Sequence, residues 1–194
     1  MTLVIVLAII IGLAVVAVAF LASRRRRSRL NPVLRVGNKL PAFTAETEDG
    51  EIVEHESLRG KPAVIVFLRG SWCPFCNNQV KNLTGHYRKI NDMGASLLFI
   101  TARPLQTTSR VAKVFGVDFT FWLDPDLKIA RLLGILSPEG VPDEIRDKFG
   151  QDTVWPTALV LDAGGTIRYA NQSSDVRARP DPAVFVRELQ KLGR

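Results

Sequence analysis

The sequence has little cysteine and little histidine, with two residues of each among 194. A fold held together by disulfides would need more cysteines, spread more widely along the chain. A structural zinc site normally has four ligands, so it would have to recruit both cysteines and both His55 and His86. His55 lies in a charged stretch at 51–56 that is expected to be a solvated hairpin, and His86 falls on the expected exposed side of a helix. The sequence therefore predicts neither a disulfide scaffold nor a metal site, and Cys73 and Cys76 form a local pair.

Acidic residues are absent before residue 31, and this absence explains the basic charge. The formal net charge is +7, and five arginines, at 24–27 and 29, supply most of it. Without these five, 21 of the 26 basic residues remain against 19 acidic ones, so the rest of the chain is close to neutral. The high pI belongs to this N-terminal flank, and we expect no nucleic-acid partner.

Polar residues are absent from residues 3–22, where every residue except Gly12 is Ala, Val, Ile, Leu or Phe. A helix of this length would cover about 30 Å, the thickness of the hydrocarbon core of a bilayer. No basic residue precedes the run, which disfavours a cleaved signal peptide. We therefore predict a transmembrane anchor at 1–23, a basic juxtamembrane linker at 24–35 and a folded domain at 36–194. The positive-inside rule predicts a single-pass protein with its domain facing the cytoplasm, and the alternative is the periplasmic or extracytoplasmic face.

The domain alternates short apolar runs with helical patterns, which predicts an α/β fold with a sheet of mixed direction. A stretch rich in Pro, Gly and charge at 137–152 is expected to be an inserted surface loop. The expected strands are 63–68, 95–101 and 119–123, with a hairpin of 157–161 and 166–170. The expected helices are 74–93, 109–115, 127–133 and 182–192.

Cys73 and Cys76 stand where a buried strand meets a helix, in the sequence FLRGSWCPFC. At a helix N-terminus, unpaired N–H groups and the macrodipole stabilise a thiolate and lower its pKa. Cys76 lies one turn further on the same face, within reach of a disulfide with Cys73. Pro74 suits the first helical position, which needs no N–H. The pattern predicts Cys73 as the nucleophile and Cys76 as the resolving thiol.

From about residue 36 the chain resembles the thioredoxin-like AhpC/TSA (peroxiredoxin-like) and membrane-tethered thiol-disulfide redoxin group. The matching blocks occur in the family's order and cover most of the domain. They are VGNKLPAF at 36–43, LRGKP at 58–62, WCPFC at 72–76, FWLDPD at 121–126 and WPTALVLD at 155–162.

The resemblance implies a thioredoxin-like fold, a mixed central sheet flanked by helices, here preceded by the N-terminal transmembrane helix. It also implies that Pro156 is a cis-proline facing the two cysteines. Substrate would then bind around Trp72, Pro74, Trp155 and Pro156. No cofactor is expected beyond the redox-active Cys73–Cys76 disulfide itself.

Two departures from the family bear on function. Peroxiredoxins carry Thr or Ser three residues before the reactive cysteine, where this chain has Gly70. Thioredoxins bury an acid six residues before it, where this chain has Phe67. Arg69 and Arg103 could each stabilise a thiolate or a peroxide, and solvation at the surface is the favoured expectation for both.

Gly70 favours a thiol-disulfide oxidoreductase over the alternative, a peroxiredoxin-like thiol peroxidase that uses the same pair. A non-catalytic tethered assembly factor is a third hypothesis, and the intact cysteines argue against it. The expected partners are a protein or small-molecule disulfide or thiol, or a peroxide, together with an upstream thiol reductant and the membrane.

Overall fold

The computed structural model describes residues 12, 30–103, 117 and 119–193. Their centre is a seven-stranded sheet in the order β2-β1-β5-β4-β3-β8-β9. β3 and β4 are parallel, as are β4 and β5, whereas β8 runs antiparallel to β3 and to β9. The predicted mixed α/β sheet is thereby confirmed. The strands are β1 (Thr44–Thr47), β2 (Ile52–Glu54), β3 (Ala63–Leu68), β4 (Ser96–Thr101), β5 (Thr120–Leu123), β8 (Thr157–Leu161) and β9 (Ile167–Gln172).

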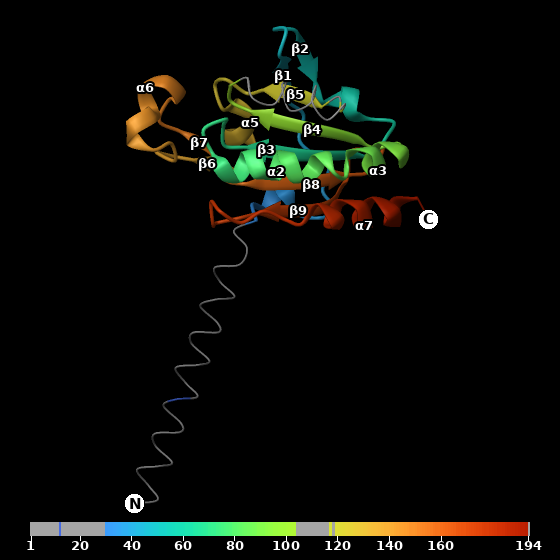
Figure 1. The fold of residues 1–194 in the computed structure, drawn as a ribbon. Helices are drawn as coiled ribbons and strands as arrows, with labels where there is room; N and C mark the ends of the chain where they lie inside the picture. Colours follow the sequence, from blue (N-terminus) through green and yellow to red (C-terminus); the bar gives the residue numbers. More distant parts are fainter. Residues whose placement is uncertain (1–11, 13–29, 104–116, 118, 194) are drawn as a thin grey trace, which may run out of the picture.

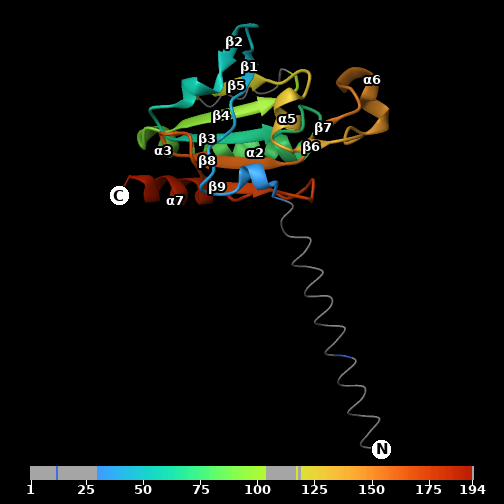
Figure 2. The same cartoon turned by 180° about the vertical axis from the view of Figure 1, so that it is seen from behind.

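The inner strands are buried on both faces, which explains their continuous apolar sequences. Every residue of β3 and of β8 is buried. Helices cover both faces of the sheet (Figures 1 and 2). On one face lie α2 (Pro74–Thr84), α3 (Tyr87–Asp92) and α7 (Pro182–Leu192), and the opposite face carries α5 (Lys128–Leu132) and the 3-10 helix η1 (Pro32–Leu34). The two cysteines belong to the core beneath α2, α3 and α7.

The helix expected over 74–93 is divided into two. α2 ends at Thr84, and α3 begins at Tyr87 after Gly85 and His86. Leu83 and Ile90 are both fully buried, so the apolar spacing remains in phase across the break. Spacing alone therefore did not reveal where the helix is interrupted. The expected helix at 109–115 lies outside the described residues.

The C-terminal part matches the sequence patterns closely. β8 and β9 form the predicted hairpin, and the turn between them is held by Asp162, whose Oδ1 accepts hydrogen bonds from the N–H groups of Gly164 and Thr166, each at 2.9 Å. α7 begins after Asp181, whose carboxylate accepts a hydrogen bond from the N–H of Ala183 at 2.8 Å. This is the capping arrangement that an Asp-Pro pair predicts.

The stretch at 137–152 is more ordered than a plain surface loop. A small two-stranded sheet closes its base, formed by β6 (Leu136–Ser137) and β7 (Thr153–Val154). Between these strands lie the 3-10 helix η3 (Asp143–Ile145) and α6 (Arg146–Phe149), which project from one end of the main sheet (Figure 1). We call residues 138–152 the flap.

The end of the predicted linker is part of the fold. Leu34, in η1, has no exposed surface and joins the core on the α5 side of the sheet. Asn31 donates its N–H to the Oε1 of Gln172 in β9 at 2.8 Å. The packed unit therefore begins before residue 36. The predicted anchor at 1–23 lies outside the described residues except for Gly12. In the part of the chain that is described, no helix has the length and apolarity to cross a membrane.

Candidate active site

The site forms where β3 ends and α2 begins. Cys73 is the N-cap residue of α2, with φ −88° and ψ 111°, and Pro74 occupies the first helical position. The carbonyl of Cys73 accepts hydrogen bonds from the N–H groups of Cys76 and Asn77, at 3.0 and 3.1 Å. Cys76 is therefore one turn into the helix and on the same side as Cys73, as the sequence predicted.

Both cysteines are free thiols with only 1% of their surface exposed. The two residues between them, Pro74 and Phe75, are exposed, and Phe75 shows 38% of its surface. The sulfur pair thus lies directly beneath the surface of the first helical turn. A reagent must reach the sulfurs past the side chains that surround them.

The environment separates the two pKa values. The pKa of Cys73 is lowered to about 5, chiefly because the Cys76 thiol donates a hydrogen bond to its sulfur. Burial opposes this shift, whereas the N–H of Cys76 and the charges of Arg179 and Arg69 reinforce it. At neutral pH Cys73 is a thiolate and is the stronger candidate for the nucleophile.

The pKa of Cys76 shifts upward for the complementary reason. Its thiol proton is held by the hydrogen bond to Cys73, and both burial and the negative charge of Cys73 disfavour a second thiolate. Cys76 therefore keeps its proton until Cys73 has lost its negative charge. This order is the one that a nucleophile and a resolving thiol require.

Arg179 completes the site, and sequence reasoning missed it. Its Nη2 lies 3.1 Å from the sulfur of Cys76 and 3.8 Å from the sulfur of Cys73, although the chain separates it from Cys73 by 106 positions. Its Nη1 donates to the carbonyls of Val176 and Ala178, at 2.9 and 2.8 Å, which fixes the guanidinium in place. Residues 177–181 fit no strand or helix pattern, so only the fold brings Arg179 to the cysteines.

Arg69 and Trp72 form the other side of the site. The guanidinium carbon of Arg69 lies 4.9 Å from the centre of the Trp72 ring, a cation–π contact. Trp72 is half-buried and packs against the core that contains both cysteines. Arg69 is itself 9% exposed, so it is a buried contributor to the low pKa of Cys73. Arg103, the second arginine considered from the sequence, is exposed at the surface.

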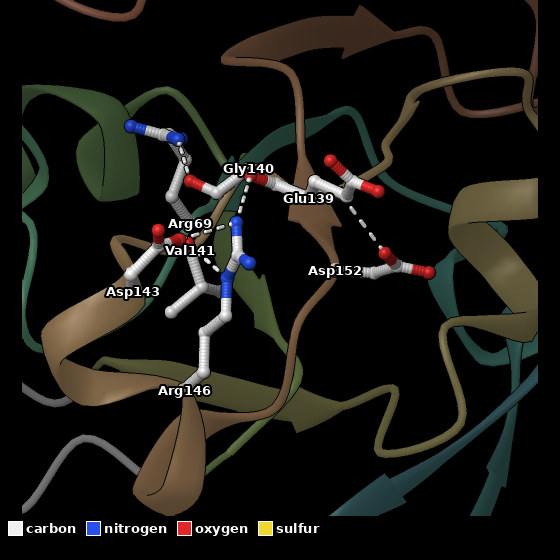
Figure 3. Close-up of polar contacts among 7 residues, drawn as sticks. All are labelled: Arg69, Glu139, Gly140, Val141, Asp143, Arg146 and Asp152. Atoms are coloured by element: carbon white, nitrogen blue, oxygen red, sulfur yellow. Dashed lines mark hydrogen bonds and ion pairs between the residues drawn. The ribbon is translucent and has the colours of Figure 1, made fainter.

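The flap holds Arg69 in this position. Arg69 Nη2 donates to the carbonyl of Gly140 at 2.5 Å, and the hydroxyl of Thr153 donates to the carbonyl of Arg69 at 2.6 Å. Figure 3 shows Arg69 and Arg146 reaching the same turn of the flap, where Arg146 Nε donates to the carbonyl of Val141 at 3.0 Å. The loop before Cys73 and the flap are therefore one polar assembly.

Trp155 and Pro156 lie beside the end of β3. Pro156 is buried, and it directly precedes Thr157, the first residue of β8, which pairs with Phe67 near the end of β3. Its carbonyl accepts a hydrogen bond from the N–H of Ser173 at 2.9 Å, and the N–H of Trp155 donates to Ile135 at 2.7 Å. In the described residues, no hydrogen bond or ring contact joins either side chain to a cysteine. Substrate binding by Trp72, Pro74, Trp155 and Pro156 stays a prediction.

The prediction that Pro156 is a cis-proline is wrong. The described residues contain no cis peptide bond, so Trp155 and Pro156 are joined in the trans form. Trans is the more stable form of most X-Pro bonds, and the cis assignment came from the family resemblance alone.

The two histidines were considered above as possible ligands of a metal ion together with the two cysteines. His55 is 7% exposed, packs against Phe43 with ring centres 5.5 Å apart, and contacts Glu56 at 2.5 Å. It is therefore buried rather than solvated as the sequence suggested. His86 precedes α3 and contacts the carbonyl of Asn82 at 3.2 Å. Among the described residues, no three His, Cys, Asp or Glu side chains are grouped to hold a metal ion.

Curated relatives of the chain are peroxiredoxins. It is 29% identical over 151 residues to "Peroxiredoxin Q, chloroplastic" of Triticum aestivum, covering 76% of this chain and 65% of the relative. It is 22% identical over 136 residues to "Putative peroxiredoxin bcp" of Coxiella burnetii, covering 69% and 85%. The chain thus spans less than two thirds of the length of the wheat protein.

Among the solved structures with the same fold are proteins named as peroxiredoxins or peroxiredoxin-like proteins. The peroxidoxin BcpB from Mycobacterium tuberculosis superposes with a TM-score of 0.65 at 17% identity, covering 82% of this chain and 98% of that one. A peroxiredoxin-like protein from Aquifex aeolicus gives a TM-score of 0.66 at 16% identity, covering 86% and 92%. At these identities the likeness shows the fold, which is thioredoxin-like and of peroxiredoxin type.

The predicted location as a single-pass membrane protein requires correction. The wheat relative is named as chloroplastic, the Coxiella relative is named as a peroxiredoxin, and no helix among the described residues is long and apolar enough to cross a bilayer. The prediction came from the composition of residues 3–22 and the arginines after them. The composition of an apolar run shows that the run is hydrophobic, and these findings do not support the membrane location that was inferred from it.

A family model settles the classification. The model described as "AhpC/TSA family" matches residues 36–170, which is well over half of the chain and includes the strand, loop and helix that carry both cysteines. The chain therefore belongs to the AhpC/TSA family.

Proposed function

We propose that this protein is a thiol peroxidase, in which Cys73 reduces a hydroperoxide and Cys76 resolves the product. The observation that carries the proposal is the difference between the pKa values of the two adjacent thiols: the pKa of Cys73 is lowered to about 5, and that of Cys76 is raised. Kinship with peroxiredoxin Q and bcp supports it. The order of the two hypotheses drawn from the sequence, which placed disulfide exchange first, is thereby reversed.

The steps follow from the geometry. The Cys73 thiolate attacks one peroxide oxygen, the O–O bond breaks, and the other oxygen leaves as water or an alcohol after taking up a proton. Cys73 is then a sulfenic acid. The sulfur of Cys76 attacks the sulfur of Cys73 and releases water, which leaves the Cys73–Cys76 disulfide. Two thiols of a reductant return the pair to its starting state.

Arg179 has a defined part in this cycle. Its guanidinium donates toward both sulfurs and compensates the charge of the Cys73 thiolate. When Cys73 becomes neutral, the same cation favours loss of the proton from Cys76. Thioredoxins use a buried acid near the second cysteine, and here Phe67 occupies that position, so Arg179 is the charged group at hand.

Rapid mixing of the reduced protein with hydrogen peroxide tests the proposal. Trp72 lies beside Cys73, so its fluorescence should change as the sulfur is oxidised. We expect a second-order reaction far faster than that of a free thiol, abolished in Cys73→Ser. In Cys76→Ser it should proceed and stop at the sulfenic acid. A rate no faster than that of free cysteine would exclude a peroxidase.

Thiol-disulfide exchange is the second candidate, favoured by the close Cys73–Cys76 pair and by Gly70 in place of the Thr or Ser of peroxiredoxins. The same fluorescence trace, recorded with a protein disulfide in place of peroxide, separates the two functions. Faster oxidation by the protein disulfide than by peroxide would favour exchange. A function retained in the double variant Cys73→Ser, Cys76→Ser would instead indicate a non-catalytic assembly factor.

A further inference from the structure

A groove opens next to the sulfur pair, between the outer surface of α2 and the segment that leads into α7. Its volume is about 530 Å³, within the range of small-molecule sites. Phe75, between the two cysteines, lines one part of it, and Arg177 and Arg179 line another. Its remaining wall is rich in side-chain amides: Asn78, Gln79 and Asn82.

Two side chains that line the groove each contain a buried polar atom that has no hydrogen-bond partner among the described residues. One of these atoms is the Oε1 of Gln79, a side chain that is 4% exposed, and the other is the Nε of Arg179. Buried polar groups are normally paired, and each unpaired one costs free energy. Gln79 needs a donor and Arg179 needs an acceptor. A peptide-type amide group offers both, through its N–H and its carbonyl oxygen.

The groove also carries positive charge that no carboxylate of the described residues neutralises. Within the described part of the chain, neither Arg177 nor Arg179 forms an ion pair with a carboxylate. The one acid in the lining, Asp181, already accepts the N–H of Ala183 at the start of α7. A ligand with carboxylate groups is therefore favoured over a neutral one.

Arg179 connects the groove to the redox state of the cysteines. In the reduced protein its charge is balanced by the Cys73 thiolate. In the disulfide both sulfurs are neutral, and the guanidinium loses that negative partner. The groove is thus most attractive to an anion at the stage of the cycle when a reductant is needed.

We propose that this groove binds the reductant of the enzyme, and that this reductant is a small peptide-like thiol with carboxylate groups. The proposal rests on the proposed function, since it assigns the step that closes the same cycle. The thiolate of the first molecule attacks one sulfur of the Cys73–Cys76 disulfide, and the S–S bond breaks to give a mixed disulfide and a cysteine thiolate. A second molecule attacks the mixed disulfide and leaves as the oxidised dimer. Two thiols lose two electrons and two protons in total. The enzyme gains both electrons, Cys76 takes up one proton, and the second proton goes to solvent because Cys73 is left as a thiolate.

The test isolates the reductive half of the cycle. The full chain is oxidised with diamide, which requires no peroxidase activity, and its reduction is followed by Trp fluorescence. Glutathione serves as the anionic peptide thiol, and 2-mercaptoethanol serves as the small neutral thiol. We expect the rate to saturate with glutathione, to fall with added salt, and to rise linearly with 2-mercaptoethanol.

Variants then locate the binding site. Arg177→Gln, at an exposed position, and Gln79→Met, which keeps the length of the side chain, should each raise the half-saturating glutathione concentration about tenfold. Neither change should alter the rate with 2-mercaptoethanol. Arg187→Gln, on the exposed surface of α7 outside the groove, is the matched control and should behave as the parent protein.

Linear dependence on glutathione, or equal effects of Arg177→Gln and Arg187→Gln, would overturn the assignment. The peroxide reaction of the reduced protein is measured separately. If that reaction is slow while glutathione saturates as described, the proposed peroxidase fails and the reductant site stands. If the reaction with peroxide is fast but the rate of reduction does not saturate with glutathione, the reductant site fails and the proposed peroxidase stands.

Discussion

Gly70 occupies a position in the loop before Cys73 that a residue with a side chain would not fit. Its φ is +146°, a conformation that residues with side chains rarely adopt. A Cβ built on it would lie 2.5 Å from the Nε1 of Trp72. A Thr or Ser at this position would therefore displace the Trp72 ring and its contact with Arg69. The peroxiredoxin hydroxyl is missing here because this loop places an indole where that side chain would extend.

Cys73 should show its low pKa in chemical reactivity. We expect the rate of alkylation by iodoacetamide to rise with a midpoint near pH 5. Arg179→Gln removes one of the two nearby positive charges and should move the midpoint upward by about one pH unit. The measurement is the rate of alkylation against pH, with Arg187→Gln as the control. A midpoint above pH 8 in the parent protein would contradict the thiolate assignment.

The same pKa values set the dependence of stability on pH. Cys73 has a folded pKa of about 5, below the roughly 8.5 of an unfolded thiol, so its contribution is complete above pH 8.5 and is lost as pH falls toward 5. The raised pKa of Cys76 acts oppositely at alkaline pH, where only the unfolded thiol ionises. The free energy of unfolding of the reduced protein, measured with urea at a series of pH values, should show this contribution. In Cys73→Ser the decrease on the acidic side, between about pH 8.5 and pH 5, should be absent.

Strands and helices with simple hydrophobic patterns were predictable. β3, β4 and β8 are continuous apolar runs because both of their faces are covered, and α7 begins at an Asp-Pro pair that caps it. Patterns of this kind depend only on local residues. They sufficed to predict the mixed sheet and to place Cys73 at the start of a helix.

Other features depend on contacts that no local pattern encodes. The break between α2 and α3 keeps the apolar phase, so the spacing of Leu83 and Ile90 conceals it. The strands β6 and β7 contain two residues each, too few to produce a periodic signal. The flap between them was therefore expected to be a plain loop.

A buried hydroxyl at the base of the flap should contribute to holding the flap in place. Thr153 is 2% exposed, and its Oγ1 donates to the carbonyl of Arg69 at 2.6 Å. Thr153→Val keeps the shape but leaves that carbonyl without its partner, and we expect a loss of about 1–2 kcal/mol in the free energy of unfolding. Amide hydrogen exchange in residues 138–152 should accelerate as well.

The matched control is Thr120→Val, at an exposed position of β5. It should change neither the free energy of unfolding nor the exchange of the flap appreciably. Equal behaviour of the two variants would mean that the flap does not depend on this contact.

The complete chain brings distant segments together at the site. β3 and α2 supply the cysteines, the flap fixes Arg69, and the segment before α7 supplies Arg179. The order of the family blocks in the sequence was sufficient to predict the fold that assembles them. It did not identify Arg179, which belongs to none of those blocks.

The redox behaviour of the whole protein follows from this assembly. A thiolate stabilised by Cys76, Arg179 and Arg69 favours the reduced state, as in strongly oxidising dithiol proteins. We therefore expect a reduction potential above the roughly −270 mV of thioredoxin. Equilibration with dithiothreitol buffers, followed by Trp fluorescence, measures it. Arg179→Gln should lower the potential, and a parent value below that of thioredoxin would contradict the expectation.

The position of Cys76 within the first turn of α2 bears on inactivation by excess oxidant. Because the two sulfurs already face each other on one turn, closing the bond between them requires no unwinding of the helix. In the proposed peroxidase cycle, Cys76 would therefore capture a sulfenic acid on Cys73 before a second peroxide molecule could convert it to the irreversible sulfinic form. A peroxidase built in this way would keep turning over at oxidant concentrations that disable enzymes whose partner cysteine must first travel to the reacting sulfur.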